Sequence, residues 1–192
     1  MFVITALYYD NMRAKWIWLL AMVIVPVSLL VWASKDSRPP TALLQAALKS
    51  SRRNKAQVAN KHYLTVIDYT KPVLVKRLWV VELATGKTVL SSHVSHALNS
   101  GLLYATNFSN VEGSEMSCSG SFVTQATYQG RFGYSLRVQG LDAENSNTGR
   151  RSIVFHPSPI PLYSHGCWMT TPATNQALIN LIKGGSFVYV TR

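Results

Sequence analysis

The residues best suited to chemistry lie near the end of the chain, in the tetrapeptide Ser164-His165-Gly166-Cys167 and at His156, eleven residues before the cysteine. A thiolate attacks carbonyl carbon readily, but a free thiol with a pKa near about 8.5 is little ionised at neutral pH. A nearby imidazole can accept the thiol proton. The pattern is therefore typical of a cysteine site that transfers an acyl group.

The spacing of the two histidines predicts different roles for them. His165 is two residues from Cys167, and side chains two apart in a tight loop rarely face each other. His156 ends an expected strand and can approach the sulfur from across the site, so we expect His156 to be the base and His165 to line the site. Ser164 could orient a histidine, and the N–H groups of Gly166 and Cys167 could stabilise an oxyanion.

Three other interpretations of Cys167 stay open at this stage. Most isolated cysteines are small buried apolar residues. A disulfide with Cys118, the other cysteine of the chain, would block nucleophilic chemistry. A metal site lacks support, because no further cysteine or histidine lies at zinc-like spacing.

The N-terminal region carries an uncharged apolar segment, residues 16–33. At 1.5 Å per residue it is just long enough to cross a bilayer core of about 30 Å. It fits a cleaved signal peptide ending at Val31-Trp32-Ala33 or an uncleaved anchor with Trp16 and Trp32 at the two interfaces. Either one predicts export, with membrane contact through residues 16–33, although the basic residues that follow favour a cytoplasmic body. Translation could start at Met1 or at Met12.

The excess of positive charge is regional. The formal net charge is +11, and ten of the 19 basic residues lie between Lys35 and Arg77. Such a stretch could follow nucleic acid, an anionic membrane or an anionic polymer. No zinc-finger, helix-turn-helix or aromatic RNA-binding pattern accompanies it, so we expect no nucleic-acid partner. Some of these basic residues belong to a helix expected after residue 40. Their side chains could form an ordinary solvated surface, or they could attract the chain to an anionic cell envelope.

The elements that position the cysteine follow a linker at Ser37-Arg38-Pro39-Pro40. Thr41 can cap a helix whose apolar residues recur at helical spacing and which runs into a basic stretch. From Tyr63 the period changes to two, which predicts strands. We expect them at residues 63–69, 73–83, 88–94, 121–128, 133–138, 152–156 and 186–190, with a hairpin turn at 84–87. One helix, after Thr171-Pro172 and ending before Gly184-Gly185, precedes the last strand. The fold class is mainly β (α+β).

Taken together, these residues resemble a known family. The Ser-His-Gly-Cys motif after an upstream histidine is similar to that of the L,D-transpeptidases (YkuD-like), in the murein L,D-transpeptidase catalytic-domain branch. The resemblance covers roughly Lys61 to Arg192 and extends over residues 64–72, 76–80, 99–101, 105–110, 113–114, 128–130, 133–137, 140–141, 151–156 and 183–186.

The resemblance implies a β-sandwich or barrel whose catalytic cysteine lies on a loop facing a groove. It implies attack on the L,D peptide bond after diaminopimelate in a peptidoglycan stem peptide, release of D-Ala, and transfer of the acyl group to an amine or to water. Cys167 would be the nucleophile, His156 the general base, and Ser164, His165 and Gly166 the supporting loop. It implies no cofactor and no metal, and places the reaction in the periplasm or cell envelope.

The chain is therefore divided into a signal or anchor (1–33), a linker with a basic helix (34–60) and a catalytic domain (61–192). It departs from the family pattern at Pro157, where glycine is common, in the short seven-residue link from His156 to Ser164, and at Trp168, which could stack on substrate or pack in the core. An L,D-carboxypeptidase and an inactive murein-binding domain remain alternatives, and the oligomeric state is left open.

Overall fold

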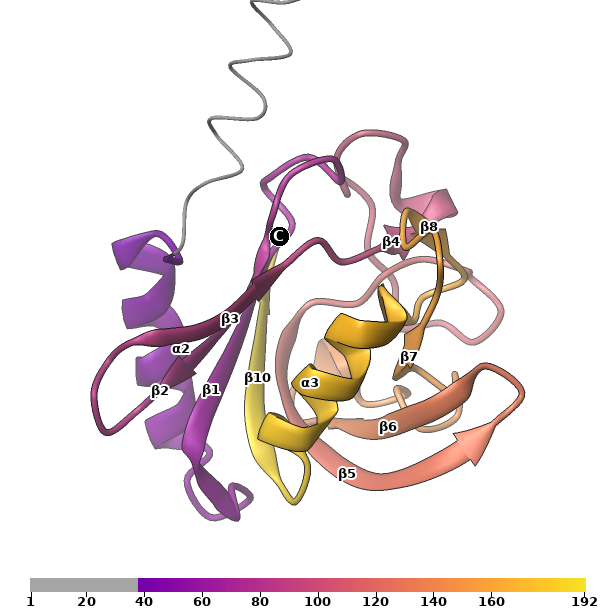
Figure 1. The fold of residues 1–192 in the computed structure, drawn as a ribbon. Coiled ribbons are helices and arrows are strands. Elements are labelled where there is room, and N and C mark those ends of the chain that lie inside the picture. The colour runs from indigo at the N-terminus through magenta and orange to yellow at the C-terminus, as the bar shows by residue number, and fades with distance from the viewer. Residues whose placement is uncertain (1–37) are drawn as a thin grey trace, which may run out of the picture. The chain divides into compact units, whose positions relative to one another are not determined.

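The computed structural model describes residues 38–192. The expected signal peptide or anchor, residues 16–33, lies outside the described residues. Within 38–192, no helix combines the length and apolar character needed to cross a bilayer. Two helices, two 3-10 turns and ten strands make up the described part of the chain (Figure 1).

The strands form a long curved sheet and a small one. The large sheet has eight strands in the order β3-β2-β1-β10-β5-β6-β7-β9, and β4 pairs with β8 in the small sheet. Their bounds are β1 Asn60–Asp68, β2 Leu78–Glu82, β3 Thr88–Ser92, β4 His96–Ala97, β5 Gly120–Gly130, β6 Gly133–Gly140, β7 Val154–Pro157, β8 Tyr163–Ser164, β9 Trp168–Thr170 and β10 Ser186–Thr191. The 3-10 turns are η1 Leu98–Ser100 and η2 Ala143–Asn145. The expectation of a mainly β fold is confirmed.

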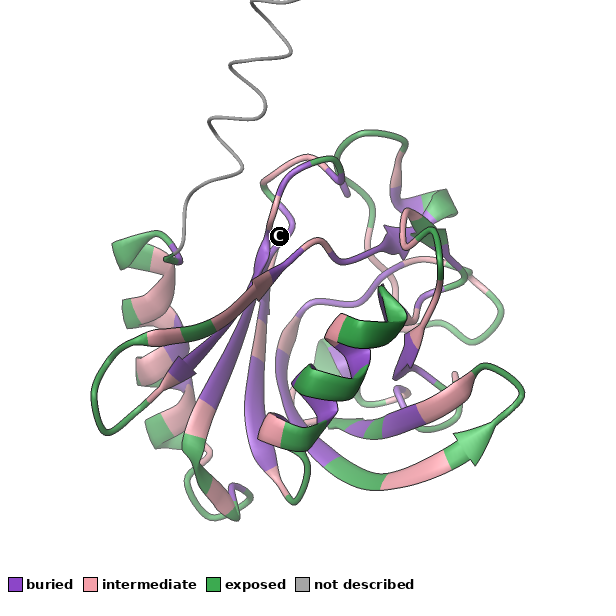
Figure 2. Cartoon of the chain, viewed as in Figure 1, coloured by how far each residue is buried: buried purple, intermediate pink, exposed green. Residues whose placement is uncertain are grey.

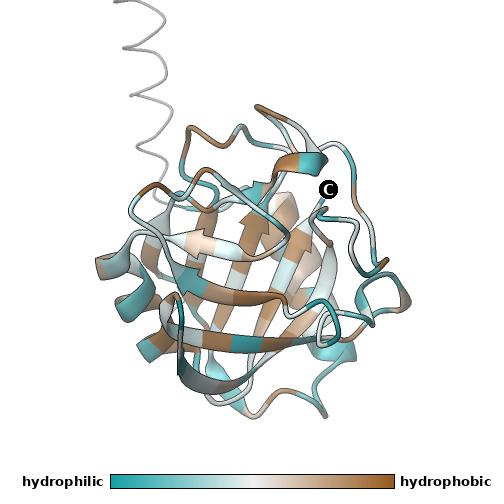
Figure 3. Ribbon diagram, turned by 90° about the vertical axis from the view of Figure 1, so that its right-hand side faces the viewer, coloured by the Kyte–Doolittle hydropathy of each residue, from teal (hydrophilic) through white to brown (hydrophobic). Residues whose placement is uncertain are grey.

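The central strands β1 and β10 run parallel and are covered on both faces. Side chains alternate between the faces of a strand, so Leu64 and Val66 lie on one side of the sheet and Ile67 on the other. Figure 2 shows these two strands as mostly buried. Figure 3 shows hydrophobic residues concentrated along the strands, as a sheet covered on both faces requires.

The lead-in helix α2, Thr41–Arg53, packs on one face of the sheet. Ala47 is fully buried, and the Ser50 hydroxyl hydrogen-bonds that of Ser121 on β5 at 2.7 Å. Thr41, the expected cap, is instead the first residue of the helix. Pro40 occupies the cap position, and no side chain caps the helix. Its basic residues Arg52 and Arg53 are exposed, as a solvated face requires.

The second helix, α3, Pro172–Ile182, covers the other face of the sheet. Thr171 takes the cap position and Pro172 the first turn, as expected. Leu178, Ile179 and Ile182 are fully buried against β1, β6 and β7, while the outer side of the helix is exposed (Figure 2). The helix therefore supports the strands that carry the candidate site.

Two expectations about strands were wrong. The expected strand at residues 73–83 begins only at Leu78. Val73 bonds instead to the carbonyl of Leu103, at 2.9 Å, because residues 71–77 form a loop around the buried Arg77 side chain. The short strands β4, β8 and β9 were not expected, because two or three residues show no alternation. They flank the cysteine loop.

Candidate active site

A cavity of about 480 Å³ contains the predicted nucleophile and base. Four elements line it: the tip of the β5–β6 hairpin, the start of β7, the β8–β9 loop and the residues just before β7. Its lining comprises Tyr128, Gly130, Arg131, Phe132, Arg151, Ser152, Val154, His156, Tyr163, Ser164, His165, Cys167 and Met169. The structure thus brings four of the five expected site residues to one cavity.

The register of β7 and β9 explains why Cys167 and His156 share a face. The two strands are parallel, with Phe155 opposite Trp168 and His156 opposite Met169. Alternation turns Phe155 and Trp168 into the core, where their ring centroids lie 4.7 Å apart. The side chains of Cys167 and His156 point to the opposite face of the sheet and line the cavity. They are diagonal neighbours in the ladder, which corresponds to about 7–8 Å between Cα atoms.

Trp168 was expected either to pack or to stack on substrate. Its side chain is fully buried and contacts Phe122 edge to face, with centroids 5.0 Å apart, as well as Phe155. The expectation that it packs is confirmed. Its burial anchors the end of the loop that carries Cys167.

The Ser164 hydroxyl closes the cysteine loop. It donates to the carbonyl of Cys167 at 2.7 Å and accepts from the N–H of Gly166 at 3.1 Å. The hydroxyl therefore holds loop backbone, and the expectation that it orients a histidine was wrong. The Gly166 N–H is already paired within the loop, so the expected oxyanion donor pair is reduced to the N–H of Cys167.

Gly166 has a backbone conformation that other residues rarely adopt. Its φ is +124°, and a Cβ atom there would come within 2.6 Å of the Ile153 side chain. The same Cβ would crowd the carbonyl of Met116. Glycine is therefore required at this position for the loop to pass so close to the segment before β7.

The Cys167 thiol donates to the carbonyl of Ser152 at 3.5 Å. Burial raises the thiol pKa, while the N–H of Val154 and the guanidinium groups of Arg151 and Arg131 act in the opposite direction. Ser152 itself has a φ of 52°, an unusual value for a residue with a side chain. Cys118 and Cys167 are both free in the structure, so the alternative of a disulfide between them was wrong.

His156 is kept neutral by its surroundings. Burial lowers its pKa, the carbonyl of Pro157 raises it, and the Arg131 cation lowers it further. Its Nδ1 lies 3.0 Å from the Pro157 carbonyl, which can only accept, so Nδ1 carries the proton and Nε2 has a free lone pair. The Phe132 ring stacks on the imidazole with centroids 4.4 Å apart. The histidine is therefore fixed in orientation and able to accept a proton.

His165 lies at the rim of the cavity, with 82% of its side chain exposed. Its Nδ1 is 3.1 Å from a carboxylate oxygen of Glu115, which is itself half exposed. His165 therefore lines the rim of the cavity, as predicted, and the role of His156 as base stays a prediction.

Comparison with known proteins gives this geometry a family. The model of the family described as "L,D-transpeptidase catalytic domain" matches residues 35–191 of the chain. The chain belongs to this family. The matched range includes α2, which precedes Lys61, where the sequence resemblance begins. Membership supports a transpeptidase-type activity. No curated protein matches the sequence.

Solved structures of L,D-transpeptidases are similar at low identity. One from Mycobacterium smegmatis is 13% identical, with 68% of this chain and 59% of that chain covered and a TM-score of 0.45. One from Stackebrandtia nassauensis is 18% identical, with 78% and 64% covered and a TM-score of 0.44. L,D-transpeptidase 3 from Mycobacterium tuberculosis is 12% identical, with 68% and 60% covered and a TM-score of 0.46. The chain spans about three fifths of their lengths.

In this L,D-transpeptidase catalytic domain, the cysteine loop is held by residues that the sequence did not identify as part of the site. The Ser95 hydroxyl donates to the Cys167 carbonyl at 3.1 Å and accepts from the N–H of Met169 at 2.9 Å. Ser95 is fully buried, and its carbonyl accepts from the Tyr69 hydroxyl. It lies just before β4, whose pairing with β8 was not expected, so no local pattern could identify it.

A buried cation supports this small sheet. The fully buried Arg77 donates twice to the Val94 carbonyl and once to Nδ1 of His96, at 2.8 Å. Burial lowers the pKa of Arg77 to about 10. His96 Nε2 lies 2.7 Å from the Gly101 carbonyl and must donate to it. These bonds hold β4, which pairs with Tyr163–Ser164 at the start of the cysteine loop.

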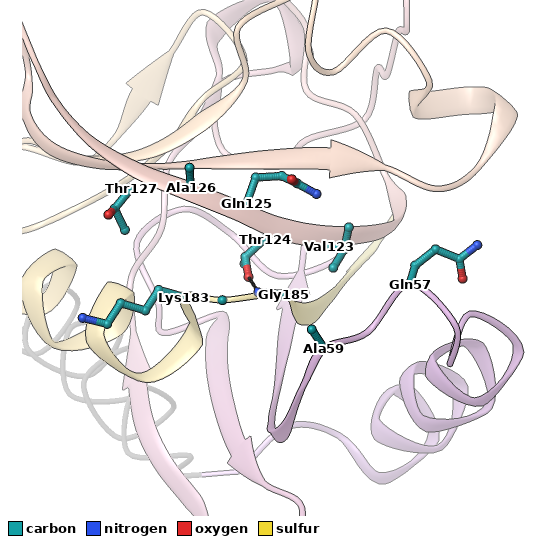
Figure 4. A pocket seen from close by; sticks show the side chains of 10 residues that line it. Gln57, Ala59, Val123, Thr124, Gln125, Ala126, Thr127, Lys183 and Gly185 are labelled. Carbon is teal, nitrogen blue, oxygen red and sulfur yellow. Dashed lines mark hydrogen bonds between the residues drawn. The ribbon is translucent and has the colours of Figure 1, made fainter.

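A larger cavity of about 590 Å³ lies between α3, β5 and the segment before β1 (Figure 4). The Thr124 hydroxyl accepts there from the N–H groups of Gly185 and Ser186. Lys183 is the one ionisable side chain in its lining, and neither cysteine nor histidine is present. This cavity therefore lacks the side chains of the predicted cysteine chemistry. Among residues 38–192, no three side chains of metal-binding type come together.

Proposed function

We propose that the chain is a cysteine-dependent L,D-transpeptidase of peptidoglycan stem peptides. The observation that carries this proposal is the placement of Cys167 and His156 on one face of the β7–β9 pair, in one cavity, in a member of this family. In the first half-reaction the enzyme releases D-Ala, and in the second it transfers the acyl group to an amine.

The chemistry follows from the state of the two side chains. Burial disfavours the charge on both, so the resting pair is a neutral thiol and a neutral imidazole. Nε2 of His156 accepts the thiol proton as the sulfur forms a bond to the carbonyl carbon of the residue before D-Ala. The C–N bond then breaks, and D-Ala leaves with the proton from the imidazolium. A thioester on Cys167 remains.

The second half-reaction reverses these proton transfers. His156 takes a proton from the acceptor amine, whose nitrogen attacks the thioester carbon. The C–S bond breaks and the thiolate regains a proton from the imidazolium. During both steps the N–H of Cys167 is the loop donor proposed for the oxyanion, because that of Gly166 is bonded to Ser164.

The proposed substrate requires a location outside the cytoplasmic membrane. We therefore propose that residues 16–33 act as a signal peptide or as an anchor, and that the enzyme works in the periplasm or cell envelope. N-terminal sequencing of the mature protein tests this: a chain that keeps residues 16–33 and stays in the cytosol contradicts export.

Incubation of the full chain with purified tetrapeptide muropeptides tests the function. We expect cross-linked dimers, detected by product mass. Tripeptides without dimers would indicate an L,D-carboxypeptidase, and unchanged substrate would indicate a binding domain. Replacement of Cys167→Ala is expected to abolish turnover, whereas Cys118→Ala, at the buried second cysteine, keeps it. Turnover by the Cys167→Ala variant would refute the mechanism.

A further inference from the structure

The tip of the β5–β6 hairpin reaches the catalytic cavity. Gly130 pairs with Gly133, and the two residues between them, Arg131 and Phe132, form the turn. Both side chains are exposed, and both line the cavity. The two-residue turn of the hairpin therefore presents both side chains to the cavity.

Three groups are stacked in series at this tip. The Arg131 guanidinium lies 4.5 Å from the centroid of the Phe132 ring, and that ring lies on the imidazole of His156. Stacking on an aromatic ring restrains a guanidinium without using its N–H groups. The cation is therefore held close to the catalytic histidine with its hydrogen-bonding edge available.

Arg131 is uncommitted, in contrast to the other arginine of the cavity. Arg151 donates from both terminal nitrogens, to the carbonyls of Ser109 and Met116. Arg131 makes no hydrogen bond or ion pair with any residue between 38 and 192, so its donors face no partner from the described chain. A planar guanidinium with free donors matches a carboxylate bidentately.

The charge of the cavity favours an anionic group. Its lining includes two arginines and two histidines but no aspartate or glutamate. Glu115, the acidic residue at the rim, already faces His165. Burial raises the pKa of Cys167 and lowers that of His156, and the Arg131 cation opposes the first shift and adds to the second.

We propose that Arg131 binds the C-terminal carboxylate of the donor peptide, next to the bond that is cleaved. This assignment rests on the proposed function, because it takes the donor to be a tetrapeptide stem. The carboxylate belongs to the leaving residue and lies one residue beyond the scissile carbonyl. Arg131 thus selects donors that end one residue after the cleavage point.

Binding to the full chain carrying Cys167→Ala tests the assignment without turnover. Three synthetic tetrapeptide stems are compared by calorimetry: the free acid, the C-terminal amide, and a stem amidated at the side-chain carboxylate of diaminopimelate. We expect the acid to bind roughly 10- to 100-fold more tightly than the C-terminal amide. Adding Arg131→Gln should remove that preference by weakening the acid alone.

A matched control variant is available on the neighbouring strand. Arg137 also lies over an aromatic ring, 4.3 Å from the centroid of Tyr128, but does not line the cavity. Arg137→Gln is therefore expected to keep the preference for the free acid. Equal loss of affinity for acid and C-terminal amide in Arg131→Gln, or a loss that follows amidation of diaminopimelate instead, would overturn the assignment.

The two proposals fail in different ways. If the unmodified protein forms no products from tetrapeptides while the acid preference depends on Arg131, the proposed activity is wrong and the carboxylate site stands. If it forms cross-linked dimers but Arg131→Gln binds acid and amide with an unchanged ratio, the activity stands and the carboxylate site is wrong.

Discussion

The Phe132 ring lies on the imidazole of His156, with centroids 4.4 Å apart and planes inclined by 20°. The hairpin that carries Phe132 is remote in sequence from β7, so the contact fixes the histidine from outside its own strand. Together with the bond from Nδ1 to the Pro157 carbonyl, it leaves the imidazole one orientation. The proposed base is thus restrained before substrate binds.

Removal of the Phe132 ring should therefore slow catalysis more than it weakens binding. An aromatic contact of this kind contributes about 0.5–1.5 kcal/mol, so Phe132→Ala is expected to lower kcat roughly two- to tenfold. Phe132→Tyr keeps the stacking and should keep most of the rate. Steady-state kinetics check this. A higher KM with unchanged kcat would show that the ring serves substrate binding, directly or through Arg131, and does not position His156.

Ser164→Ala removes two hydrogen bonds inside the cysteine loop, to the Cys167 carbonyl and from the Gly166 N–H. We expect a loss of about 1–3 kcal/mol in the free energy of unfolding, measured with denaturant. Ser158→Ala, whose hydroxyl bonds an exposed carbonyl of the preceding link, should change it by less than about 0.5 kcal/mol. Equal effects of the two substitutions contradict a structural role for Ser164.

Gly166→Ala should destabilise the loop because its φ of +124° and the nearby Ile153 side chain exclude a Cβ atom. The expected cost is about 1–3 kcal/mol of unfolding free energy, with loss of activity as Cys167 is displaced. Gly149→Ala is the control, because no atom lies within 4 Å of its Cβ position. That variant should be neutral or slightly stabilised. A fully active Gly166→Ala protein would disprove the close approach.

The buried His96 is expected to lower the stability of the folded protein in acid. Burial and the adjacent Arg77 lower its pKa, so the folded protein keeps it neutral, whereas the unfolded chain takes up a proton below about pH 6.5. The free energy of unfolding should therefore be highest above about pH 6.5 and fall as the pH decreases. His156, with its pKa lowered in the same direction, contributes likewise.

His96→Gln should flatten this acid dependence, measured as unfolding free energy against pH, although the substitution also alters the bonds to Arg77 and Gly101. Replacement of the exposed His62 by glutamine controls for the loss of a histidine. An acid slope that His96→Gln leaves unchanged would place the responsible groups elsewhere.

The regular elements could be predicted from sequence because their signals are local. Alternation marked β1, β5, β6 and β10, and the cap and proline marked the start of α3. The motif and the strand-end position also indicated Cys167 and His156. Their shared face depends on the parallel register of β7 with β9, which the structure supplies.

Contacts between distant segments could not be predicted in the same way. Ser95, Arg77 and His96 reach the cysteine loop through β4, a strand of two residues with no pattern to reveal it. Arg131 and Phe132 enter the cavity because the β5–β6 hairpin, which is part of the large sheet, ends there. The pairing of the Gly166 N–H with Ser164 likewise depends on how the loop closes, which spacing does not encode.

The most direct test of the central claim is the intact mass of the full-length protein after brief incubation with a tetrapeptide stem. We predict a covalent adduct equal to the substrate minus D-Ala, mapped by peptide digestion to Cys167 and absent in Cys167→Ala. Cross-linked product formed without any adduct on Cys167, or an adduct on Cys118 instead, would contradict the account.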